Sequence, residues 1–64
     1  MNWNEISEEE FQAWEDVRVS GATNMFDVPM VMKLAQGLIS EKQIETIMGS
    51  YSELKKKYPQ VREG

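Results

Sequence analysis

The 64-residue sequence contains no histidine and no cysteine, and these two absences exclude large classes of chemistry. Without these side chains there is no imidazole general base, no thiolate nucleophile and no nitrogen and sulfur shell for a zinc ion. Disulfide bonds are excluded as well. We therefore expect a protein that is not an enzyme, binds no metal and uses no cofactor.

The sequence also lacks an apolar run long enough to cross a membrane, and its start lacks the basic and apolar segments of a secretion signal. Its charge is acidic, with 7 basic residues against 11 acidic ones, which argues against contacts with a nucleic-acid backbone. We expect a cytoplasmic protein that has neither nucleic acid nor membrane among its partners.

Two helix starts follow the same pattern. Ser7 is followed three residues later by Glu10, and Ser40 is followed three residues later by Gln43. In such capping boxes the serine hydroxyl and the later side chain each accept a hydrogen bond from the other residue's backbone N–H. The pattern predicts helices that begin at about residues 8 and 41.

A third helix is predicted to begin after Asp27, with Phe26 and Val31 packed together as a hydrophobic staple. Gly21 and Gly37 lie where the first two helices should end. We predict one all-α domain over residues 1–64, with flexible ends at 1–5 and 60–64 and three helices at about 8–20, 28–37 and 41–57.

The predicted second helix is apolar nearly all round, and such a helix is normally buried on every side. Two other short helices cannot cover all of its surface, so we expect a homo-oligomer. The predicted interface consists of Val28, Met30, Met32, Ala35 and Ile39. The alternative is that Met30 and Met32 simply remain exposed, as single apolar residues on protein surfaces often do.

The segment RVSGATNMFD, residues 18–27, is followed by VMKLA at 31–35. It resembles the RxSGxTNM-F/L-D segment, followed by V-x-x-L-A, of a family of small uncharacterised proteins from Firmicutes and their phages. The resemblance covers residues 11–35 and implies an origin in a phage or mobile element. The expected location is then the cytoplasm of the host cell.

The polar residues of this segment have two interpretations. In the first they only shape the turn between two helices, because Gly, Thr and Asn are common turn residues. In the second, Arg18, Ser20, Thr23 and Asn24 converge on a small anionic or nucleotide-like ligand. Asp27 at the next helix start would repel a phosphate placed there.

The leading hypothesis is a small phage or mobile-element accessory protein that binds a host protein and modulates or inhibits it, for instance in host defence. One alternative is an oligomeric protein that sequesters a small molecule or nucleotide at residues 18–24. A further alternative is an atypical helix-turn-helix DNA-binding protein. Its reading helix would carry Glu41 and Glu45, which are unfavourable near phosphates.

Overall fold

Five helices follow one another in the computed structural model, which describes residues 2–21 and 23–61. They are the 3-10 helix η1 (Trp3–Glu5) and the α-helices α1 (Glu8–Ser20), α2 (Val28–Leu34), α3 (Glu41–Gly49) and α4 (Tyr51–Lys57). The predicted all-α class is confirmed. Within the described ranges, no helix combines the length and apolar character that a membrane crossing needs.

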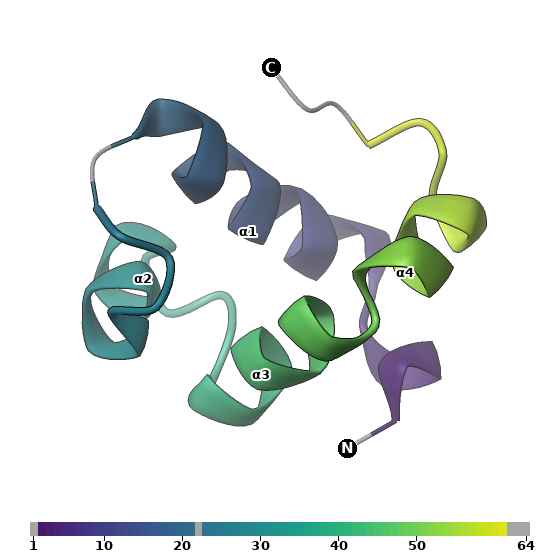
Figure 1. The fold of residues 1–64 in the computed structure, drawn as a ribbon, viewed down its shortest axis with the longest axis horizontal. Helices are drawn as coiled ribbons and strands as arrows, with labels where there is room; N and C mark the ends of the chain where they lie inside the picture. The colour runs from purple at the N-terminus through teal and green to yellow at the C-terminus, as the bar shows by residue number, and fades with distance from the viewer. Residues whose placement is uncertain (1, 22, 62–64) are drawn as a thin grey trace.

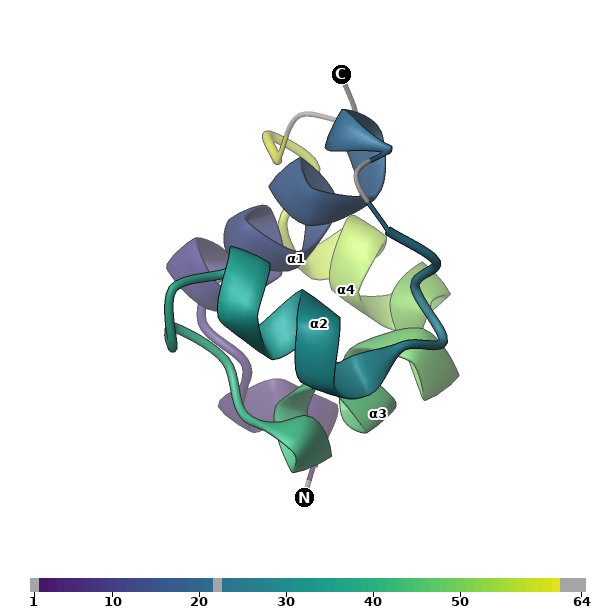
Figure 2. The ribbon, with the colours of Figure 1, turned by 90° about the vertical axis from the view of Figure 1, so that its left-hand side faces the viewer.

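The helices are arranged around α1, which runs across the back of the molecule while α3 and α4 lie in front of it (Figure 1). α2 closes one end, where it packs against α1 and α3, and α4 packs against α3 and η1. Seen from that end, α2 lies between α1 above and α3 below (Figure 2). Every helix contributes to one core, whose buried apolar residues are Ile6, Phe11, Ala13, Trp14, Val17, Val31, Ala35, Ile39, Ile44, Ile47, Leu54 and Val61, with Trp3 packed against them.

Both predicted capping boxes are present and joined to each other. Ser7 N–H donates to Glu10 Oε1 (2.8 Å), and Ser40 N–H donates to Gln43 Oε1 (2.7 Å). The serine hydroxyls accept the return bonds from the backbone N–H groups of Glu10 and Gln43. Gln43 Nε2 also donates to Glu10 Oε2, so one chain of hydrogen bonds fixes the starts of α1 and α3 side by side.

α1 has the predicted bounds, but α2 ends at Leu34, three residues before the predicted 37. Gln36 N–H donates to the Lys33 carbonyl (3.0 Å) and Gly37 N–H to the Met32 carbonyl (3.2 Å). This is the bond pattern of a Schellman ending. The left-handed residue that ends the helix is Gln36, with φ of 57°, and Gly37 follows it with φ of 78°.

The predicted third helix is two helices, because the chain departs from helical geometry at Ser50, with φ of −130° and ψ of 33°. Ser50 N–H still donates to the Thr46 carbonyl (2.9 Å), and Leu54 N–H donates to the Ser50 carbonyl (3.1 Å). The break is therefore local. It follows Gly49, the residue with the weakest helix propensity in this stretch.

The described parts of the two ends, within 1–5 and 60–64, contact the rest of the chain, and their predicted flexibility stays a prediction. Residues Trp3–Glu5 form η1, and Val61 is buried with 3% of its surface exposed. Two lysines of α4 hold these segments, since Lys57 Nζ donates to the Asn4 carbonyl (2.9 Å) and Lys55 Nζ donates to the Val61 carbonyl (3.3 Å). Residues 1 and 62–64 lie outside the described part of the chain.

Candidate functional site

An open hollow with a volume of about 790 Å³ lies between α1, α3, α4 and the segment that links α1 to α2. Met25 and Phe26 reach the hollow from the linking segment, and the chain leaves α1 through Gly21, which has a left-handed φ of 65°. The residues that line the hollow are Trp14, Arg18, Met25, Phe26, Met48 and Tyr51.

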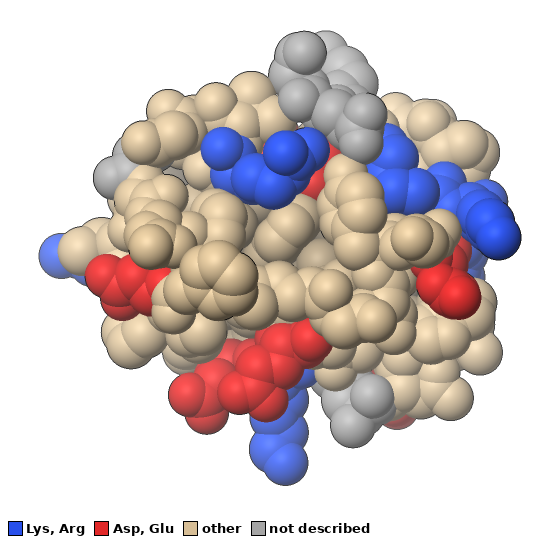
Figure 3. Space-filling view, viewed as in Figure 1, with Lys and Arg blue, Asp and Glu red and all other residues tan. Residues whose placement is uncertain are grey.

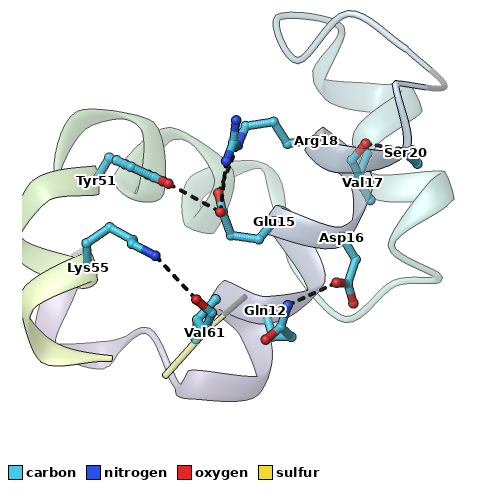
Figure 4. A network of polar contacts seen from close by, with 9 residues as sticks. All are labelled: Gln12, Glu15, Asp16, Val17, Arg18, Ser20, Tyr51, Lys55 and Val61. Carbon is cyan, nitrogen blue, oxygen red and sulfur yellow. Dashed lines mark hydrogen bonds and ion pairs between the residues drawn. The ribbon is translucent and has the colours of Figure 1, made fainter. Parts of the chain in front are cut away.

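A buried carboxylate organises the polar side of this hollow. Glu15 on α1 is fully buried, and Arg18 one turn later donates from Nε to Oε1 (2.9 Å) and from Nη2 to Oε2 (3.0 Å). The Tyr51 hydroxyl reaches the same carboxylate from α4 and donates to Oε2 (3.2 Å) (Figure 4). The guanidinium carbon of Arg18 lies 5.9 Å from the ring centroids of both Trp14 and Tyr51.

This arrangement determines which kind of group the hollow can take. Two of the five N–H donors of the Arg18 guanidinium already bind Glu15, and the two charges cancel. An incoming anion would therefore meet a paired cation with a carboxylate directly behind it. The remaining wall is aromatic rings and methionine side chains, so the hollow is best suited to an uncharged apolar group.

The four residues predicted to bind an anionic ligand are not gathered around the hollow. Arg18 lines it, whereas Ser20, Thr23 and Asn24 are not among the lining residues. The Ser20 hydroxyl donates to a backbone carbonyl of α1 (2.7 Å), and Asn24 Oδ1 accepts a hydrogen bond from Phe26 N–H (2.9 Å). Both contacts are local and of the kind that the turn interpretation describes.

The predicted interface on α2 requires correction. Ala35 and Ile39 have 5% and 2% of their surface exposed and belong to the core of the chain itself. α2 ends at Leu34, so Ile39 is not on this helix and lies in the core instead. Val28 and Met32 are half-buried against the same core, and Met30 is 38% exposed.

The strongly exposed apolar side chains are therefore mostly other residues than those predicted. Phe26 has 82% of its surface exposed, followed by Leu38 (49%), Val19 (46%), Leu34 (39%) and Met30 (38%). The sequence pattern placed Phe26 in a staple with Val31, but Val31 is fully buried while the Phe26 ring lies at the mouth of the hollow. Within α2 the four-residue spacing of Met30 and Leu34 was a signal for this group, whereas Phe26 and Leu38 lie outside the helix and carried no such signal.

Charged groups border this apolar region unevenly. On the face drawn in Figure 3, Lys and Arg groups gather toward α1 and α4, and the largest acidic cluster lies over α3. α3 carries the exposed acids Glu41 and Glu45. The helix that would read DNA in a helix-turn-helix protein thus presents carboxylates to solvent.

Comparison with known proteins finds no matching protein family, no matching curated protein and no matching solved structure. The hollow and the exposed Phe26 side chain that lines it are thus the features that bear on function.

Proposed function

We propose that the chain is a small non-enzymatic accessory protein of a phage or mobile element, and that it acts by binding a host protein and modulating or inhibiting it. The observation that carries this proposal is the exposed Phe26 ring at the mouth of an apolar hollow. The resemblance of residues 11–35 to small phage proteins motivates the context.

The composition of the hollow supports protein binding. Aromatic residues, methionine and arginine are enriched at protein interfaces, and Trp, Tyr and Arg are the residues that most often dominate binding energy. Trp14, Tyr51 and Arg18 meet here within contact distance of one another. The internal pairing of Arg18 with Glu15 favours an apolar side chain of the host protein as the group that enters.

We also propose that the chain is a homo-oligomer. The exposed apolar side chains of Phe26, Met30 and Leu34 follow one another at four-residue spacing and are the surface that supports this. A large apolar side chain left in water forgoes roughly 1.5–3 kcal/mol that burial would contribute. A chain of this size gains stability by covering such side chains with a second copy.

A second candidate function is the binding of a small molecule, and it is supported by the volume of the hollow. About 790 Å³ lies within the range of roughly 300–1,000 Å³ that is usual for small-molecule sites. The neutral Arg18–Glu15 pair favours an uncharged aromatic or aliphatic ligand over a nucleotide.

A site-specific photo-crosslinker separates the two candidates. We would place benzoylphenylalanine at position 26 and, as the matched control, at position 19, where Val19 is also exposed (46%) but does not line the hollow. The proposal predicts that position 26 and not position 19 is linked to a defined host protein in bacterial cells. No host product at position 26, together with a small molecule retained in native mass spectrometry, would favour the second candidate.

A further inference from the structure

We infer that two copies of the chain pair about a two-fold axis so that the Phe26 ring of each copy enters the hollow of the other. This inference rests on the proposed self-association and specifies how it is made. It concerns the same hollow that the proposed host contact uses.

The exposed ring of Phe26 is the group that enters the other copy. Phe26 lines the hollow and yet has 82% of its surface exposed, so it stands at the mouth without filling the space. Its backbone is held by Asn24, whose side chain accepts from Phe26 N–H (2.9 Å). The ring is thus presented by a fixed turn, which reduces the entropy lost on binding.

The hollow offers the surroundings that such a ring requires. Its wall contains Trp14 and Tyr51, whose ring centroids are 5.7 Å apart, and the methionines Met25 and Met48. Aromatic rings attract one another in offset and edge-to-face arrangements, and methionine sulfur packs favourably against ring edges. An inserted phenyl ring would contact groups of both kinds.

A second copy is the occupant that the geometry favours. The ring and the hollow lie together on one face, so a single two-fold rotation places both rings in both hollows at once. In such an isologous pair every contact is made twice. Two rings that are each moved from water into an apolar hollow would provide the centre of the interface.

The charges around the hollow fit this rotation. Because Glu15 neutralises Arg18, the basic side of the face is set by the Lys and Arg groups that gather toward α1 and α4 in Figure 3. On the α3 side Glu45 is exposed and lies one helical turn before Met48. A two-fold axis parallel to these two edges sets the basic edge of each copy against the acidic edge of the other, and Figure 3 shows the same division across that face.

A stable interface needs only a small part of the accessible surface of the chain. Stable interfaces bury at least about 1,000 Å² in total, or roughly 500 Å² from each copy. This is close to an eighth of the 4059 Å² accessible on one chain. Met30, exposed on α2, is a further apolar side chain of the same segment that a second copy can cover.

Pairing of this kind restricts the access of a host protein to the hollow. If a second copy fills the hollow, a host segment must displace the Phe26 ring before it can bind there. Self-association and host binding then exclude each other at this surface.

Complementation between two variants tests the reciprocal insertion. Phe26→Ala removes the ring and keeps the hollow, whereas Met48→Glu blocks the hollow and keeps the ring. In sedimentation equilibrium we expect each variant alone to dimerise at least 100-fold more weakly than the natural chain, because both ring contacts are lost. An equimolar mixture should form a heterodimer through one intact contact, and Val19→Ala should dimerise normally.

The results distinguish a failure of the proposed self-association from a failure of the ring insertion alone. A natural chain that stays monomeric up to millimolar concentration would overturn both the proposed self-association and this inference. A dimer that Phe26→Ala leaves intact would retain self-association and overturn the inference. Circular dichroism checks that each variant is folded. If Met48→Glu is unfolded, isotope-filtered NOEs from Phe26 ring protons of one copy to the Met48 methyl of another decide the question, and their absence in a dimer would overturn the inference.

Discussion

The body formed by α1, α3 and α4 and the segment from residue 23 to residue 38 are built differently. In the body, the helix starts are fixed by two joined capping boxes, and Phe11, Ile44, Ile47 and Leu54 are fully buried. In the segment, α2 has seven residues and buries Val31 fully, while Phe26, Leu34 and Leu38 face solvent.

The difference separates residues that stabilise the fold from residues that are available for binding. Most apolar side chains in the body are already covered, and the half-buried Met48 and Tyr51 at the hollow are the ones that a partner can still contact. Those of the segment still have most of their burial energy to gain, which is the property of an interaction surface.

Replacing one phenylalanine in each region is the strongest test of the difference between the body and the segment. Phe11→Ala leaves a cavity in the core and should lower the free energy of unfolding by about 3–5 kcal/mol. A domain of this size has about 3–10 kcal/mol in total, so this variant should lose about a third or more of its stability. Phe26→Ala should change the stability of the monomer by less than about 0.5 kcal/mol. Urea denaturation at low protein concentration measures both, and equal losses would remove the distinction.

Arg18→Ala tests whether the polar corner of the hollow belongs to the stable body. It leaves the fully buried Glu15 carboxylate with the Tyr51 hydroxyl and without its charged partner. We expect a loss of about 2–3 kcal/mol, and Arg18→Lys should recover part of it but not the paired geometry. Thermal melting of the three proteins is the measurement. An unchanged melting temperature together with lost binding would instead identify Arg18 as a ligand contact.

Gln43→Ala removes the link between the two helix starts as well as one capping bond. The expected loss is about 1–1.5 kcal/mol, whereas Gln60→Ala on the exposed C-terminal turn should cost almost nothing. The double variant with Glu10→Ala should lose less than the sum of the single losses, because the two side chains contact each other. Strict additivity in chemical denaturation would show that the link contributes nothing.

The smallest expected effect is a gain of stability in the segment. Gln36 has φ of 57°, a conformation that glycine adopts without steric cost. Gln36→Gly should therefore stabilise the fold by about 0.5–1 kcal/mol, whereas Gln36→Val should destabilise it. The difference in melting temperature between the two variants is the readout, and a lower value for the glycine variant would contradict the assigned role of this turn.

Local signals predict the helix starts well, because each capping box is contained in four consecutive residues. The sequence also places Gly21 at the end of α1 and identifies α2 as the element whose apolar surface exceeds what the fold can cover. These features depend on hydrogen bonds and periodicity within one element, so they can be read without knowledge of the fold.

The candidate site was harder to predict because its residues meet through tertiary contacts. The Glu15–Arg18 spacing is visible in the sequence, but Tyr51 joins that pair from 36 positions away. The early end of α2 depends on a left-handed glutamine, which ordinary propensities do not favour. That end decides that Ile39 is buried and that Leu38 is exposed, so the residues of the predicted interface were partly wrong.

The most direct test of the central claim, that the Phe26 segment is a binding surface and the hollow its receptor, is methyl NMR of the methionines over a concentration series. We expect the Met25 and Met48 methyl resonances to shift as the protein concentration rises, because a Phe26 ring from a second copy approaches them. Met32, which does not line the hollow, should keep its position. Identical spectra from micromolar to millimolar concentration would contradict the account.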